Sequence, residues 1–129
     1  HKRIIDFDLK KNDRIPNEGV LHLDCTFNPV GKDKCIIYKN GFVDINDYNL
    51  IVDIFGTENI FEVNDEEMFG MNPNVFSIST EVVVSDETFV RMNNHLRNEW
   101  GLTVEEIPYR EISKMGGLLR CSTMPLVRE

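Results

Sequence analysis

The feature that most constrains the fold of this chain is an order of strand and helix signals that occurs twice. In the first copy, alternating apolar residues predict strands at 20–27 and 34–39, which a turn-forming stretch joins into a hairpin. A helix is then predicted from Asn46 to the stop signal Gly56, because apolar residues between them recur at helical spacing. A strand at 59–63 ends the copy, so the order is ββαβ.

The second copy repeats this order further along the chain. Strands at 74–79 and 82–85 predict another hairpin. A longer helix is expected to begin with Asp86 as its cap and to end at Gly101. The following strand, predicted at 102–107, again gives the order ββαβ.

The remaining signals connect and follow the two copies. Asn64 and Glu67 have the spacing of a capping box, which predicts a short capped turn between the copies. A turn or short helix at 109–115 and a last strand at 124–128 are expected after the second copy. A unit of this kind cannot bury its own apolar face and must stack on others. Two units and a strand do not close such a stack, so we expect the chain to form part of a larger one.

The chain is long enough for one domain. Its 129 residues are 41% hydrophobic and 28% charged, an ordinary globular composition. Residues 1–19 are polar and charged and end in turn-forming residues, which predicts an incoming linker or loop. The predicted domain therefore covers residues 20–129.

The charge and the cysteines narrow the class of protein. A net charge of -8 argues against a nucleic-acid partner and against an anionic membrane surface. No run of 18 apolar residues is present, and the first residues lack the apolar core of a signal peptide. Three irregularly spaced cysteines suit a reducing compartment better than a disulfide framework, so we expect a cytoplasmic protein.

Cys121 is the first candidate for chemistry. It follows the glycine pair at 116–117 and lies between Arg120 and the polar Ser122 and Thr123. A thiolate is a strong nucleophile when a nearby cation or histidine holds its charge. The alternative is a small buried hydrophobic residue, the commonest role of a free cysteine. The local sequence leaves both interpretations open.

His22 and Asp24 are the second candidate pair. On the predicted strand they point to one side of the sheet, whereas Cys25 points to the other. A histidine and a carboxylate on one face suit general acid–base catalysis or cation binding. A hydrogen-bonded pair at the surface, with no catalytic role, is the alternative.

No metal or cofactor is expected. His22 and Cys25 face opposite sides of the predicted strand, and no second pair of ligands accompanies them. A structural zinc site needs about four ligands in tetrahedral geometry. The glycines form neither a phosphate-binding loop nor a dinucleotide-binding fingerprint.

Taken together, the motifs resemble a known superfamily. HLDCTF at 22–27 resembles the histidine strand of deiminases, and RCSTMPLVRE at 120–129 resembles their cysteine strand. SKMGGLLRC is similar to the dimethylarginase form of that loop, and NPNVFSISTEVVVS to the stretch before the family's last long helix. From about residue 20 to its end, the chain resembles the amidinotransferase, or guanidine-modifying, superfamily. That superfamily contains arginine deiminases, dimethylarginine dimethylaminohydrolases and glycine amidinotransferases.

The resemblance implies a fold. Members have the pentein fold, a five-bladed α/β propeller of ββαβ modules around a central site. The chain would then be an incomplete C-terminal portion, with about two modules plus a strand. Its partners would be a small guanidino or ureido substrate and the N-terminal half of the same protein. A homo-oligomer is left open.

The resemblance also implies a site and a reaction. Cys121 would attack the guanidino or ureido carbon of an arginine-like compound and form a covalent intermediate. His22 would be the general acid and base, and Asp24 would bind the guanidinium. The deiminase-like strands favour a hydrolase. An amidinotransferase that passes the amidino group to an acceptor amine, and a non-catalytic binding factor with the same fold, are the alternatives.

Two departures from the family pattern matter. The glutamate that orients the family's histidine, and a further substrate-binding aspartate, lie in the N-terminal half, so we expect the isolated chain to be inactive. Deiminases also have an arginine a few residues before the cysteine, and this arginine holds the substrate carboxylate. Gly116 stands at the matching place here, which leaves the identity of the substrate open.

Overall fold

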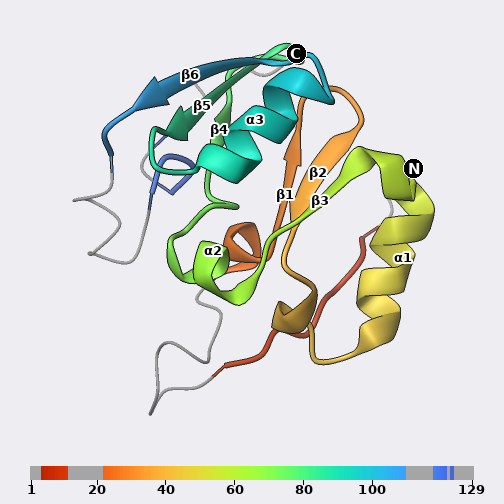
Figure 1. The fold of residues 1–129 in the computed structure, drawn as a ribbon. Coiled ribbons are helices and arrows are strands. Elements are labelled where there is room, and N and C mark those ends of the chain that lie inside the picture. The colour runs from red at the N-terminus through yellow and green to blue at the C-terminus, as the bar shows by residue number, and fades with distance from the viewer. Residues whose placement is uncertain (1–3, 12–21, 110–117, 122, 124–129) are drawn as a thin grey trace.

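The computed structural model describes residues 4–11, 22–109, 118–121 and 123. Within this part, the chain forms two three-stranded sheets and three α-helices (Figure 1). The first sheet contains β1 (Phe27–Val30), β2 (Lys34–Ile37) and β3 (Ile60–Glu62). The second contains β4 (Phe76–Ser77), β5 (Val82–Asp86) and β6 (Thr103–Ile107). The helices are α1 (Ile45–Phe55), α2 (Asp65–Phe69) and α3 (Val90–Asn98).

The two sheets have the same topology. In the first, β1 and β2 are antiparallel, and β3 returns parallel to β2 after α1. In the second, β4 and β5 are antiparallel, and β6 returns parallel to β5 after α3. The helical crossover is what a parallel pair requires. The predicted ββαβ repeat is therefore confirmed, and we call the two copies the first and the second module.

The elements form alternating layers. Helix α3 lies between the two sheets, and α1 lies on the other side of the first sheet (Figure 1). One buried cluster joins Phe61 of β3, Leu96 of α3 and Val104 of β6, so it spans both modules. A second cluster packs Ile37 of β2 against Ile51 of α1. The first sheet is thus buried on both faces.

Helix ends largely follow the sequence signals. The carboxylate of Asp44 accepts a hydrogen bond from the Asn46 backbone, so α1 begins one residue before the predicted start. Gly56 ends this helix with a φ of 82°, a conformation that glycine adopts without strain. The capping box of Asn64 and Glu67 is present at the start of α2. The predicted stop at Gly56 and the predicted capping box at Asn64 are therefore confirmed.

The predicted strand at 20–27 is wrong at residues 22–26. Residues 23–25 form a 3₁₀ turn, in which the amides of Cys25 and Thr26 donate to carbonyls three residues earlier. The strand begins at Phe27 and includes Pro29, which was expected to break it. Among the described strands, β1 lies at the edge of its sheet, the position in a sheet where proline is tolerated.

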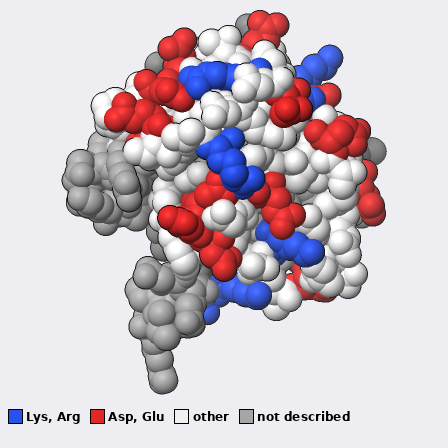
Figure 2. All heavy atoms as spheres, in the orientation of Figure 1, with Lys and Arg blue, Asp and Glu red and all other residues white. Residues whose placement is uncertain are grey.

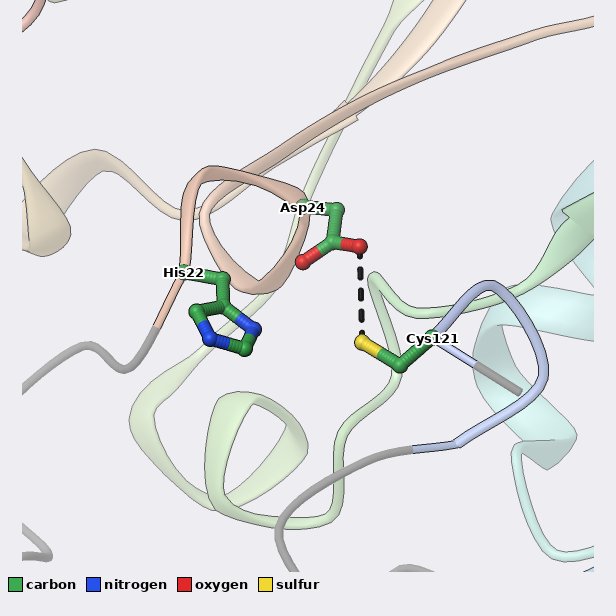
Figure 3. Close-up of side chains that lie close together, drawn as sticks. All are labelled: His22, Asp24 and Cys121. Atoms are coloured by element: carbon green, nitrogen blue, oxygen red, sulfur yellow. Dashed lines mark hydrogen bonds between the residues drawn. The ribbon is translucent and has the colours of Figure 1, made fainter. Parts of the chain in front are cut away.

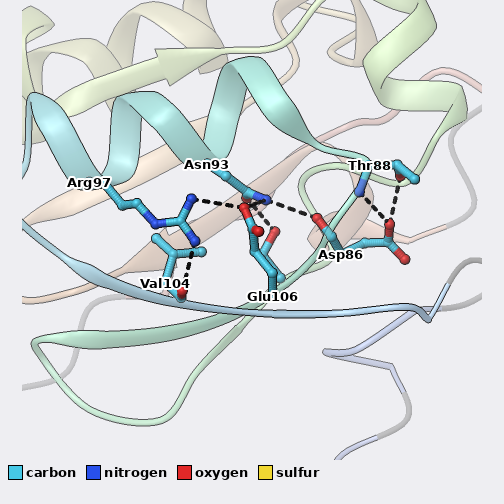
Figure 4. Close-up of polar contacts among 7 residues, drawn as sticks. Asp86, Thr88, Asn93, Arg97, Val104 and Glu106 are labelled. Carbon is cyan, nitrogen blue, oxygen red and sulfur yellow. Dashed lines mark hydrogen bonds and ion pairs between the residues drawn. The ribbon is translucent and has the colours of Figure 1, made fainter.

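The predicted start of the long helix at Asp86 is also wrong. Asp86 is the last residue of β5, and α3 begins at Val90. Its fully buried carboxylate accepts hydrogen bonds from the backbone and hydroxyl of Thr88 (Figure 4). It also accepts one from the backbone of Tyr109. Asp86 thus caps the loop before the helix, not the helix itself.

The segment before the first module packs against it. Leu9 forms an isolated bridge with Phe42, and the ring of Phe7 contacts those of Phe27 and Phe42. Residues 1–3 and 12–19 of the predicted linker, and the expected elements at 110–115 and 124–128, lie outside the described residues.

Charged side chains are spread over the surface. On the face shown in Figure 2, acidic and basic side chains are interspersed, and no continuous basic surface is visible. None of the helices in the part of the chain that the structure describes has the length and hydropathy needed to cross a bilayer.

A buried polar network ties α3 to the second sheet (Figure 4). The Asn93 side chain is fully buried and accepts a hydrogen bond from the Ser85 hydroxyl at 2.6 Å. It donates to the Asp86 carbonyl at 2.9 Å and to a Glu106 carboxylate oxygen at 3.0 Å. Arg97 pairs with the same Glu106 oxygen at 2.8 Å. All polar atoms of the Asn93 side chain are thereby used.

Asn93→Ala should lower the stability of the fold. The substitution removes the acceptor of the buried Ser85 hydroxyl, and leaving such a group unpaired costs about 1–3 kcal/mol. It also removes one of the donors to the Asp86 carbonyl, which keeps the hydrogen bond from the Phe89 amide. We expect a loss of roughly 2–4 kcal/mol in the free energy of unfolding in urea. Asn94→Ala is the matched control. Asn94 is the exposed neighbour of Asn93 on the same helix, so its substitution should change the free energy of unfolding little. Equal losses of stability in the two variants would contradict the stabilising role of the Asn93 network.

Candidate active site

His22, Asp24 and Cys121 converge although they are far apart in the sequence. One side-chain nitrogen, oxygen or sulfur from each lies within 4.8 Å of the other two. The Cys121 thiol donates to the Asp24 carboxylate, with 3.4 Å between Sγ and Oδ2 (Figure 3). His22 and Cys121 are exposed, and Asp24 is half-buried. A thiol, an imidazole and a carboxylate therefore share one accessible place.

The 3₁₀ turn before β1 positions the first two residues. His22 is extended and precedes the turn, and its carbonyl accepts the Cys25 amide at 3.1 Å. The Cys25 side chain is buried in the main core and fixes the turn beneath Asp24. The expected convergence of His22 and Asp24 is present, but it comes from a turn rather than from two positions on one strand face.

Asn74 holds the loop that carries Cys121. The fully buried side-chain oxygen of Asn74 accepts the amides of Leu118, at 3.0 Å, and Cys121, at 3.2 Å. Its backbone carbonyl accepts the Arg120 amide at 3.2 Å, and its side-chain nitrogen donates to the Cys121 sulfur at 3.1 Å. Sequence reasoning missed Asn74 as a site residue. The available signal was a polar residue at the start of an otherwise apolar strand pattern.

The surroundings raise the pKa of the Cys121 thiol. Burial of the sulfur has the largest effect, and the negative charge of Asp24 and its hydrogen bond add to it. The Asn74 amide and the Leu118 backbone act in the opposite direction. Desolvation in the core raises the pKa of Cys25 to about 12, so this second thiol remains protonated. Without a further positive charge at the site, the protonated form of Cys121 is favoured.

A shallow pocket of about 390 Å³ is lined by two of the three residues, His22 and Asp24, and by Arg120, which precedes Cys121. Its charged lining residues are Asp24 and Arg120, and His22 also lines it. Asn28, a further lining residue, is buried and donates to the carbonyls of Pro73 and Val75 on either side of Asn74. The remaining lining residues are Leu23, Phe27 and Pro29. Gly116 lies outside the described residues.

The same three residues are the described groups that could together hold a metal ion. Imidazole, carboxylate and thiolate are all ligands of divalent transition metals. The sequence spacing could not show this set, because Cys121 joins the other two only in the folded chain.

Comparison with known proteins identifies the family. The family model for arginine deiminase matches residues 40–128, which is most of the chain. The chain belongs to the arginine deiminase family. The resemblance stated from the sequence is therefore confirmed.

Two curated relatives match over nearly the whole chain. It is 32% identical over 112 residues to the uncharacterized protein YkgA of Bacillus subtilis (strain 168). The match covers 87% of this chain and 37% of that protein. It is 28% identical over an alignment of 144 residues to the arginine deiminase of Latilactobacillus sakei subsp. sakei (strain 23K). The match covers 88% of this chain and 35% of that protein. This arginine deiminase family chain thus spans little more than a third of the relatives that it matches.

Solved structures confirm the pentein fold. The N-terminal domain of ArgZ, an arginine dihydrolase from cyanobacteria, matches with a TM-score of 0.76 and 22% identity, over 93% of this chain and 41% of that one. SxtG, an amidinotransferase from Microseira wollei, matches with a TM-score of 0.65 and 21% identity, over 85% of this chain and 32% of that one. The chain is therefore a part of a pentein-type α/β propeller.

Asp24→Asn should make the Cys121 thiol easier to ionise. The substitution removes a negative charge 3.4 Å from the sulfur, so the thiol pKa should fall. We expect alkylation of Cys121 by iodoacetamide to become several-fold faster at pH 7, measured by mass spectrometry of the Cys121 peptide. Asp53→Asn, which removes an exposed acid on α1, is the control and should leave the rate unchanged. A slower reaction in Asp24→Asn would contradict the prediction.

Proposed function

We propose that this chain is the C-terminal part of a cysteine-dependent hydrolase that acts on the guanidino or ureido group of an arginine-like compound. The convergence of His22, Asp24 and Cys121, the first two of which line a pocket, carries the proposal. Membership of the arginine deiminase family supports this class of reaction. The 28% identity to a bacterial arginine deiminase favours hydrolysis over transfer.

In the first half of the reaction, Cys121 attacks the guanidinium carbon. The thiol proton passes to His22, and a carbon–sulfur bond forms to give a tetrahedral adduct. His22 then returns the proton to the departing nitrogen, the carbon–nitrogen bond breaks, and ammonia or an amine leaves. A thiouronium group on Cys121 remains. The distances at the site suit this transfer, because sulfur and imidazole lie within 4.8 Å before substrate binds.

In the second half, water releases the product. His22 takes a proton from the water as its oxygen attacks the thiouronium carbon. The carbon–sulfur bond then breaks, the electron pair returns to sulfur, and a ureido compound leaves. In a transferase, an acceptor amine would take the place of the water.

Asp24 has two consecutive partners in this scheme. In the free site its carboxylate accepts the Cys121 thiol and disfavours thiolate. A guanidinium bound by Asp24 would neutralise that charge and bring its own positive charge close to the sulfur. Both changes favour thiolate. Binding of the cation would therefore activate the nucleophile.

The charges at the pocket also define a substrate class. Asp24 supplies a negative charge for the guanidinium, and Arg120 supplies a positive charge at the same pocket. We propose that the substrate carries an anionic group in addition to its guanidino group, and that Arg120 binds this group. Arg120 would then take over the role that the family's arginine has at the place of Gly116.

The remaining half of the protein is part of the proposal. The chain covers 32% to 41% of the relatives considered above, and by resemblance the missing part supplies the carboxylate that orients His22. We therefore expect the isolated 129-residue chain to be inactive. A cytoplasmic location and a homo-oligomeric state remain predictions.

Cys121→Ser should abolish turnover in the protein that includes the N-terminal half. A hydroxyl is far less ionised than a thiol at neutral pH, so we expect a loss of at least about 1,000-fold in kcat/KM. Ammonia, amine and ureido products from a panel of guanidines would be measured by mass spectrometry. Cys35→Ser, at a buried cysteine away from the site, is the control for loss of a thiol. Unchanged turnover in Cys121→Ser would refute the nucleophile. Amidino transfer to an added amine would favour the transferase instead.

Arg120→Ala should weaken the binding of substrates with an anionic group. Loss of a charge-assisted contact costs about 1.5–3 kcal/mol, which corresponds to a rise in KM of roughly 10-fold or more. KM for a guanidino substrate that lacks the anionic group should change little. The ratio of the two KM values is the measurement, and equal changes for both substrates would contradict the proposed role.

A further inference from the structure

We infer that the Asn74 side chain stabilises the thiolate of Cys121 and simultaneously fixes the loop that presents it, so that Asn74 is a further functional residue of this site. The inference rests on the proposed role of Cys121 as nucleophile. It concerns a residue that the sequence motifs did not identify.

The orientation of the Asn74 amide is determined by its neighbours. One end of the amide meets the backbone N–H groups of Leu118 and Cys121, at 3.0 and 3.2 Å. Backbone N–H groups can only donate, so this end must be the oxygen. The NH₂ group must then be the end that lies 3.1 Å from the Cys121 sulfur. The amide cannot be reversed without two donor–donor contacts.

The contact to sulfur is a donor contact in a protected place. Asn74 is fully buried, so water does not compete for its amide. Hydrogen bonds to a charged acceptor are stronger than those between neutral groups, so the NH₂ group interacts more strongly with thiolate than with thiol. Its effect on the sulfur is opposite to that of the Asp24 carboxylate, which repels a thiolate.

Three further hydrogen bonds hold the backbone around Asn74 in place relative to Cys121. Its carbonyl accepts the Arg120 amide, and Asn28 donates to the carbonyls of Pro73 and Val75 on either side of it. Both flanks of Asn74 are therefore attached to the first module, whereas its side chain is attached to the loop of Cys121. Because these contacts already fix the Asn74 amide, it does not have to reorient when the Cys121 thiolate forms.

The test is the pH dependence of Cys121 alkylation by iodoacetamide, in the protein with its N-terminal half and without substrate. Asn74→Ala removes the donor, and Asn74→Asp keeps an acceptor for the two backbone amides while it removes the NH₂ group. In both variants we expect alkylation at pH 7 to be roughly 10-fold slower, since a hydrogen bond to a charged group is worth at least one factor of 10. The pH midpoint should move upward, and the rates should converge with wild type at high pH.

This convergence separates stabilisation of thiolate from a purely structural role. A loop that is only displaced would change the rate at high pH as well, where all of the thiol is ionised. Asn93→Ala is the matched control, because Asn93 is an equally buried asparagine with three hydrogen bonds in the second module. It should leave the midpoint unchanged even though it destabilises the fold.

The outcomes are distinct. An upward shift in both Asn74 variants with an unchanged midpoint in Asn93→Ala supports the inference. An unchanged midpoint in either Asn74 variant, or a changed rate at high pH with no shift, overturns it. Because alkylation requires no turnover, failure of the protein to process any guanidine would refute the proposed function without deciding this test. With a working substrate, kcat should fall in the Asn74 variants more than KM rises.

Discussion

The packing of α3 between the two sheets is the interaction on which the rest of the structure depends. Met92 and Leu96 of this helix are fully buried in a core that also contains Ile36 of the first sheet and Val83 of the second. Fully burying an aliphatic side chain contributes about 1.5–3 kcal/mol, so this layer holds the modules together. Neither module has enough apolar partners of its own, because the helix of the second forms one face of the core of the first.

This interface between modules also builds the site. His22 and Asp24 precede β1 in the first module, whereas Cys121 follows the second module in sequence. The two are brought together where Asn28, in β1, donates to backbone carbonyls beside Asn74, in the approach to β4. A change in the angle between the sheets would therefore move the sulfur away from the imidazole. The geometry of the candidate site and the packing of the modules are set by the same contacts.

The sequence predicted the repeated order of elements well, because hairpins and amphipathic helices leave periodic apolar patterns. It failed where a local hydrogen bond decides the outcome. HLDC alternates like a strand, but the amides of Cys25 and Thr26 find carbonyls three residues back and form a turn. Asp86 looks like a helix cap, but its carboxylate binds Thr88 and Tyr109 across a loop. Asn74 could not be found from periodicity, because its partners lie 44 to 47 residues away.

Two polar neighbours of the Cys121 sulfur have opposite effects on its ionisation, and under the proposed function this opposition would make the site selective for cations. The Asn74 amide is a neutral donor, whereas the Asp24 carboxylate carries a full negative charge at 3.4 Å. Burial of the sulfur, together with the charge and hydrogen bond of Asp24, outweighs the Asn74 donor, so the pKa of the thiol is raised and the free site favours the thiol. A bound neutral compound would leave the Asp24 charge unchanged. Under the proposed function, a guanidinium would neutralise Asp24 and remove its opposition to the Asn74 donor, so that the thiolate would form where the substrate is already held.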